Sequence, residues 1–111
     1  MGIELELHCD RPPTTWDASR GTLLHSSYEH GDRLAEALAL LQSREPGRLP
    51  RVDPYGDTVF DGQEAESALA EIPGLLDRCA GPGQEAAVRD LAAMLRLCAA
   101  TPGSHLWFMG D

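Results

Sequence analysis

The stretch from Arg51 to Glu64, RVDPYGDTVFDGQE, gathers four carboxylates around a turn. They belong to Asp53, Asp57, Asp61 and Glu64. Grouped carboxylates can bind a divalent cation, or act as general acid and general base on a substrate. A calcium loop of the EF-hand type needs oxygen ligands at alternate positions and glycine at the sixth, and this spacing does not supply them.

Each residue of this stretch also has a structural use close to its own place in the chain. The dipeptide Asp53-Pro54 is typical of the start of a turn, and Gly56 can supply a positive φ angle. Asp57 can accept hydrogen bonds from backbone amides. Asp61 and Glu64 have the spacing of a helix capping box. We therefore expect these carboxylates to shape the backbone.

Histidines and nucleophiles form the second group of candidates. His25 and His30 could share a metal ion if the loop between them folds back, but the pattern HExxH is absent and we expect both side chains in solvent. The serines after His25 have no third group to orient them, and GxSxG is absent. Cys9 follows His8 along an expected strand, where neighbouring side chains point to opposite faces. We predict neither a metal site nor a cofactor.

Strand patterns lie at both ends of the chain. Apolar and polar residues alternate over residues 3–8, which is the period of a strand with one solvated face. Residues 21–26 predict a second short strand, and residues 58–60 predict a brief extended piece. The final HLWFMGD, residues 105–111, predicts a closing strand.

Helical periods fill the middle of the chain. The first helix is expected over residues 33–43 with Asp32 as its N-cap, and the second begins after Asp61. Pro73 should kink the second helix or restart it as the first residue of a new segment. A third helix is expected from about residue 85 to 99. These elements predict one α+β domain over residues 1–111, with neighbouring terminal strands and about three helices covering one face of a small sheet.

Composition limits the possible partners and compartments. Eighteen acidic residues against nine basic ones give a net charge of −9, which disfavours nucleic acid and anionic membranes and favours a basic protein partner. We find no apolar run of about 20 residues for a membrane span. Three widely spaced cysteines and a beginning unlike a signal peptide predict a reducing, cytoplasmic location. The chain lacks Lys and Asn and is rich in Ala, Gly and Pro, as in a GC-rich bacterial genome.

Aromatic residues are the strongest candidates for a binding surface. Trp107 and Phe108 are adjacent in the closing strand, so a regular strand places one of them outside the core. His105 alternates with Trp107 and should share its face. We therefore predict a binding surface that includes Tyr55, Asp57, His105, Trp107 and Phe108, because large rigid side chains anchor protein interfaces.

The pieces DPYGDTVF and HLWFMGD together resemble a group of small uncharacterised bacterial proteins. These share a DPYGDT-like turn and end in an aromatic strand followed by Gly-Asp. The group has no known activity, so the resemblance implies no catalytic residues. Some small acidic bacterial proteins of this general kind are immunity proteins that neutralise toxins, which is an analogy of size and charge.

The sequence thus predicts a non-enzymatic, acidic, cytoplasmic protein-binding module, an immunity or regulatory protein of a bacterium. The alternative is a small metal-dependent or hydrolytic enzyme that uses the Asp53–Asp57 loop with His25 or His105. A homodimer could also form, because an exposed edge strand can pair two copies.

Overall fold

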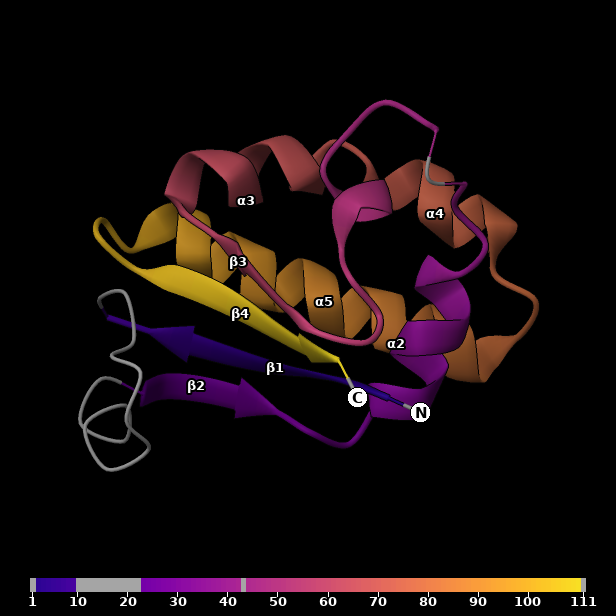
Figure 1. Cartoon of the computed structure of the whole chain (residues 1–111), viewed down its shortest axis with the longest axis horizontal. Helices are drawn as coiled ribbons and strands as arrows, with labels where there is room; N and C mark the ends of the chain where they lie inside the picture. Colours follow the sequence, from indigo (N-terminus) through magenta and orange to yellow (C-terminus); the bar gives the residue numbers. More distant parts are fainter. Residues whose placement is uncertain (1, 10–22, 43, 111) are drawn as a thin grey trace.

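A four-stranded antiparallel sheet organises the computed structural model, which describes residues 2–9, 23–42 and 44–110 (Figure 1). Within these residues the strand order is β2-β1-β4-β3. β1 (Ile3–His8) and β4 (His105–Gly110) pair at the centre, with β2 (Leu23–Ser27) beside β1 and β3 (Asp57–Phe60) beside β4. The predicted pairing of the terminal strands is therefore confirmed.

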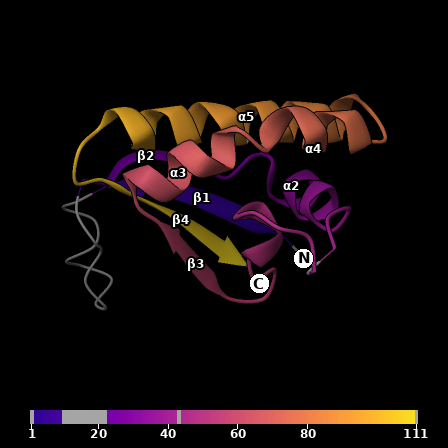
Figure 2. The same cartoon turned by 90° about the horizontal axis from the view of Figure 1, so that it is seen from above.

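Helices pack against one face of this sheet. α3 (Gly62–Leu69), α4 (Ile72–Arg78) and the long α5 (Pro82–Ala100) lie together on one side, and α2 (Gly31–Leu38) lies near the two chain ends (Figure 2). A short 3-10 turn, η1 (Leu49–Arg51), precedes β3. The α+β class and the helical cover on one face are confirmed. No helix in the described ranges is long and apolar enough to span a membrane.

The helix boundaries follow local chemistry, with a correction at each end of α2. Asp61 and Glu64 form the predicted capping box of α3, and the chain restarts at Ile72 with Pro73 in the first turn of α4. Asp32 is not the N-cap of α2. It lies in the first turn, where a carboxylate suits the helix dipole, and His30 is the N-cap without a side-chain hydrogen bond.

α2 also ends earlier than predicted, at Leu38. The chain leaves the helix through two tight backbone hydrogen bonds, from Leu40 N to Ala37 O and from Leu41 N to Leu38 O, each 3.1 Å long. Such i to i+3 bonds use carbonyls that the last helical turn would otherwise leave unpaired. The apolar period of the sequence therefore continues past the point at which the backbone stops being helical.

The core lies between the sheet and the helices. Alternate residues of the two central strands are buried there, and α5 buries one apolar side along its length. The rings of Phe60 and Phe108 meet with their centroids 4.8 Å apart. The largest fully buried side chains are Phe108, Ile3, Leu5, Leu7, Leu34, Leu49, Leu75, Leu91, Leu95, Leu106, Val88 and Cys98.

Candidate functional site

The strand register sorts the side chains of the sheet into a core face and an opposite face. Residues directly across from each other in an antiparallel pair point to the same side. Leu5 pairs with Phe108 and both are buried in the core, whereas Glu6 pairs with Trp107 on the other side. We call this other side the outer face. Its members on β1, β3 and β4 are Glu4, Glu6, His8, Asp57, Val59, His105, Trp107 and Met109. On β2, Ser26 pairs with Glu6 and lies on the same side.

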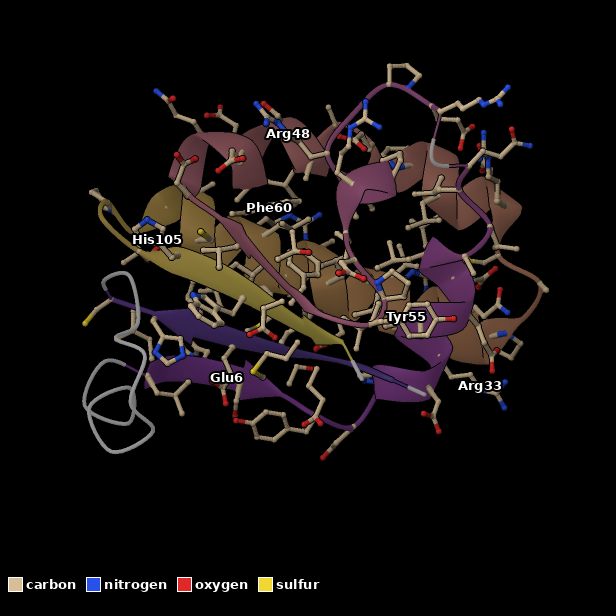
Figure 3. The ribbon with its side chains drawn as sticks, in the orientation of Figure 1. Glu6, Arg33, Arg48, Tyr55, Phe60 and His105 are labelled. Carbon is tan, nitrogen blue, oxygen red and sulfur yellow. The ribbon has the colours of Figure 1, made fainter. Side chains whose placement is uncertain are left out.

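A hydrogen-bonded group occupies the middle of the outer face. The Glu6 carboxylate accepts hydrogen bonds from His8 Nε2, at 3.0 Å, and from the Tyr28 hydroxyl. His8 is buried, and its ring meets that of Trp107 edge-on at a centroid separation of 6.4 Å. The hydrogen bond to Glu6 raises the pKa of Tyr28, and partial burial and the negative charge of Glu6 add to the shift. The Glu6 carboxylate is thus hydrogen-bonded both to its own strand, through His8, and to Tyr28 beyond β2. Figure 3 labels Glu6 and, further along the sheet, His105.

Two further polar atoms of this face are buried. They are His105 Nδ1 and Trp107 Nε1, and neither has a hydrogen-bond partner in the described part of the chain. Both side chains are otherwise partly exposed. The predicted placement of His105 and Trp107 on one shared face agrees with the register.

The DPYGDT turn uses its first carboxylate on the backbone. Asp53 Oδ1 accepts a hydrogen bond from Tyr55 N at 2.9 Å, and Asp53 N donates to Thr58 Oγ1 at 3.0 Å. Gly56 does not have the positive φ angle that the sequence suggested. A Cβ there would lie 2.7 Å from the Asp53 carboxylate, so a larger residue would make that carboxylate move.

The same turn is packed against the end of the chain. Gly110 N donates a hydrogen bond to Gly56 O at 2.8 Å. A Cβ on Gly110 would lie only 2.4 Å from Pro54 O and 2.8 Å from Asp53 O. The two sequence pieces that carry the resemblance, the DPYGDT turn and the aromatic strand ending in glycine, therefore meet in space.

The remaining carboxylates of the stretch separate. Asp61 Oδ1 accepts from Glu64 N at 2.8 Å, and Glu64 Oε1 accepts from Asp61 N at 3.2 Å. Asp57 begins β3, opposite Met109, and is exposed. Within the described residues its carboxylate accepts no hydrogen bond from a backbone amide, in contrast to the sequence expectation. We find no group of three or more His, Cys, Asp or Glu that could hold a metal ion in residues 2–9, 23–42 and 44–110.

The predicted binding residues divide between surface and core. Tyr55, at the tip of the turn, is 68% exposed. Phe108 is completely buried and packs on Phe60, so its assignment to a binding surface is corrected: it faces the helices, and Trp107 is the partly exposed member of the pair. The sequence interpretation missed Glu4, Glu6 and Tyr28. Alternation with leucine could have placed the two glutamates on the outer face, but nothing local indicates that Tyr28 reaches Glu6.

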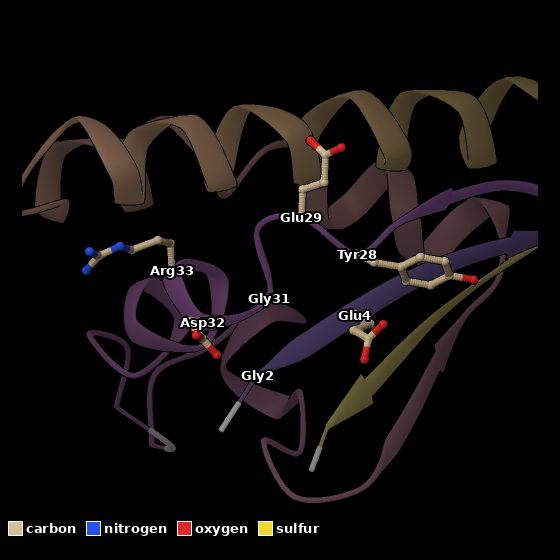
Figure 4. A pocket seen from close by; sticks show the side chains of 7 residues that line it. All are labelled: Gly2, Glu4, Tyr28, Glu29, Gly31, Asp32 and Arg33. Carbon is tan, nitrogen blue, oxygen red and sulfur yellow. The ribbon is translucent and has the colours of Figure 1, made fainter.

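An acidic hollow adjoins this face at the start of α2. It has a volume of about 420 Å³ and is lined by Gly2, Glu4, Tyr28, Glu29, Gly31, Asp32 and Arg33 (Figure 4). Arg33 is the cation of this group, and its Nη1 pairs with Glu36 at 2.9 Å instead. Among the described residues, Glu4, Glu29 and Asp32 form no ion pair. Glu4 and Asp32 lie on one side of the chain here, whereas Glu29 points toward α5 (Figure 4). The hollow thus carries acidic side chains that no described residue pairs with, beside an aromatic ring.

A second hollow, of about 310 Å³, contains the serines that follow His25. It is lined by Ser26, Ser27, Tyr28, Glu29, His30 and Asp90. The Ser27 hydroxyl donates its hydrogen bond directly to the Asp90 carboxylate of α5. A serine nucleophile is normally activated by a histidine that takes its proton. The described part of the chain forms no such serine and histidine pair, and His25 is exposed on β2.

Comparisons with known proteins gave no match, whether with family models, curated proteins or solved structures. Function therefore has to be inferred from geometry and charge.

Proposed function

We propose that this protein is a non-catalytic binding module, an immunity or regulatory protein of a bacterium, that binds a basic protein through the outer face of its sheet. One observation carries the proposal. The helices α3, α4 and α5 pack together on one side of the sheet (Figure 2). By their register, the strands carry aromatic and acidic residues together on the other side.

The composition of the outer face is that of a protein interface. Trp107, Met109 and Val59 are partly exposed, and the exposed carboxylates of Glu4 and Asp57 lie at its margins. Aromatic residues and methionine are enriched at interfaces, and a surrounding rim of charge selects the partner. The net charge of −9 would steer a basic protein toward this surface.

The alternative enzyme has less support. A catalytic site needs groups that converge within about 3 Å of a reacting atom. Asp53 is bonded to the backbone of its own turn, Asp61 caps α3, and Ser27 is bonded to Asp90. The carboxylates of the Asp53–Asp57 loop are therefore committed to structure or stand apart on the surface.

The cysteines support a reducing location such as the cytoplasm. Cys9, Cys79 and Cys98 are all free. Burial raises the pKa of the Cys79 and Cys98 thiols, which makes both poor nucleophiles. Secreted domains of this size more often cross-link their cysteines. The thiols therefore suit an intracellular binding protein better than a thiol enzyme.

Site-specific photo-crosslinking in the native host tests the proposal. A benzophenone amino acid would replace exposed Tyr55, two residues before the outer-face residue Asp57, or, as a matched control, exposed Arg96 on α5. We expect the Tyr55 position to cross-link to one protein whose isoelectric point lies above neutral, and the Arg96 position not to do so. Equal labelling at both positions, or an acidic partner, would contradict the proposal. With the purified complex, Asp57→Arg should weaken binding roughly tenfold, which is about 1.4 kcal/mol.

A further inference from the structure

We infer that the partner's chain is added to the sheet at β2, as an extended basic segment that places a cationic side chain in the acidic hollow. This inference rests on the proposed function, since it takes the partner to be a basic protein, and it specifies where and in what conformation that partner binds. The proposed function and this inference can fail separately, because different experiments test them.

Within the described residues, β2 lies at an edge of the sheet. Among the described strands it pairs with β1 and with no other strand. An unpaired edge presents a row of backbone donors and acceptors, and extended peptides bind to such edges as an additional strand. Proteins usually protect their edges with charged residues or proline, but the β2 sequence LLHSS contains neither. Leu23 and Leu24 are 38% and 44% exposed.

The register narrows the place where a strand can be added. Leu7 of β1 pairs with His25 of β2, and the next residue, His8, pairs with Leu23. Leu24 is therefore an extra residue on β2 and forms a bulge. A bulge interrupts regular pairing on its own strand. The regular part of the edge therefore runs over residues 25–27, toward the hollow, and the exposed leucines flank its beginning.

The hollow at the end of this edge suits a cation. Tyr28 follows β2 directly and lines the hollow with Glu4, Glu29 and Asp32 (Figure 4). Arg33 is held by Glu36 and does not neutralise these carboxylates. A guanidinium or ammonium group could pair with the carboxylate of Glu4 or Asp32 and lie against the Tyr28 ring. An arginine or lysine carried by the added strand would reach the hollow within a residue or two of the paired segment, because strands rise about 3.3 Å per residue.

The same charges argue against a second copy of this chain at the edge. A second copy would bring another chain of net charge −9 to this edge. Like charges across an interface disfavour association. The occupant that the charge selects is therefore a basic segment of another protein.

A synthetic peptide with alternating charge tests the inference on the full chain. The probe is acetyl-(Arg-Val)4-amide, titrated into the isotope-labelled protein and followed by amide NMR. We expect shifts in residues 25–28 and nuclear Overhauser contacts between the peptide backbone and β2. Acetyl-(Glu-Val)4-amide should leave these signals unchanged. Simple charge attraction would not produce ordered backbone contacts.

Backbone methylation separates strand addition from nonspecific attraction. In an added strand only alternate amides of the peptide face β2. We would prepare two versions of the basic peptide, one methylated on its arginine amides and one on its valine amides. One version should lose binding, because its methyl groups block the amides that face β2, and the other should still bind. The double variant Glu29→Gln with Asp32→Asn should bind the parent peptide about 3–10-fold more weakly, since two exposed charges are lost. Glu66→Gln, on the exposed side of α3, is the matched control and should bind normally.

Three results would overturn the inference. Equal binding by both methylated peptides would show that the edge is not paired. Shifts confined to Tyr55, Asp57 and Trp107 would do the same while leaving the proposed outer-face function standing. A concentration-dependent dimer with protected β2 amides would show that a second copy occupies the edge. The proposed function itself fails through the Tyr55 cross-link, whatever the peptide does.

Discussion

Gly110 has no room for a side chain because the DPYGDT turn is packed against its Cα. We expect Gly110→Ala to destabilise the protein by about 1–3 kcal/mol, as for other overpacked sites, since a Cβ would lie 2.4 Å from the backbone oxygen of Pro54. Urea unfolding measures the change. Gly74 is the matched control, because no heavy atom lies within 4 Å of the position that a Cβ would take there. Gly74→Ala, in α4, should stabilise by about 0.5–1 kcal/mol.

If Gly110→Ala unfolded at the same urea concentration as the parent protein, the contact between the turn and β4 would not require glycine at position 110. The DPYGDT turn would then need another explanation for its glycine and proline. A loss of stability confined to Gly110→Ala, with a gain for Gly74→Ala, would confirm that the space beside Pro54 is the cause.

Tyr28 should report the hydrogen-bonded group on the outer face. Its pKa lies above the ordinary value of 10.0, chiefly because its hydroxyl donates to Glu6. We expect Glu6→Gln to lower the Tyr28 pKa toward that value, measured from the ring carbon shift in a pH titration by NMR. Glu66→Gln should leave the titration unchanged.

The sign of the accompanying stability change follows from the raised pKa. The folded state prefers the protonated phenol of Tyr28, so this contribution is complete below pH 10.0 and disappears as the pH rises through the folded pKa. The parent protein should therefore lose its advantage over Glu6→Gln at strongly alkaline pH. An advantage that grew with pH would contradict the proposed hydrogen bond.

The 3-10 turn η1 depends on the side chain of Glu71, the N-cap residue of α4. The Glu71 carboxylate accepts hydrogen bonds from Arg48 N at 2.8 Å and from Leu49 N at 3.0 Å. These bonds hold the turn at Gly47, whose φ is +120°, and keep Leu49 in the core. Glu71→Ala should cost about 1–3 kcal/mol, because two backbone donors lose a charged acceptor.

Thermal or urea unfolding of Glu71→Ala, compared with Glu66→Ala on the exposed side of α3, measures this effect. Glu66→Ala should change the free energy of unfolding little, since exposed substitutions seldom exceed about 0.5 kcal/mol. Equal effects from both substitutions would show that the carboxylate of Glu71 does not hold the turn.

The order of the strands predicts cooperative unfolding of the entire chain. β1 and β4 come from opposite ends of the sequence, pair at the centre of the sheet, and share a core with α5. Loss of either end of the chain should therefore unfold both the sheet and the helices. We expect helix content, followed by far-UV circular dichroism, and Trp107 fluorescence in a Trp16→Phe variant to change at the same urea concentration. Separate midpoints would contradict the prediction of a single domain.

Much of the fold could be read from local patterns in the chain. The alternation over residues 3–8 and the helical periods after Asp32 and Asp61 depend on near neighbours, and the elements formed where these patterns lie. The capping box and the restart at Pro73 were predictable for the same reason, since each depends on residues a few positions apart. Helix ends were less predictable, because the apolar pattern continues beyond Leu38.

The candidate site depended on contacts between distant parts of the sequence. Whether Trp107 or Phe108 enters the core is set by the register of β4 on β1, which no local pattern of two adjacent aromatics can specify. Tyr28 meets Glu6 across 22 residues, and Gly110 meets Pro54 across the length of β3 and three helices. Local sequence determined the helices and strands, but the packing of the chain's two ends determined which side chains became neighbours.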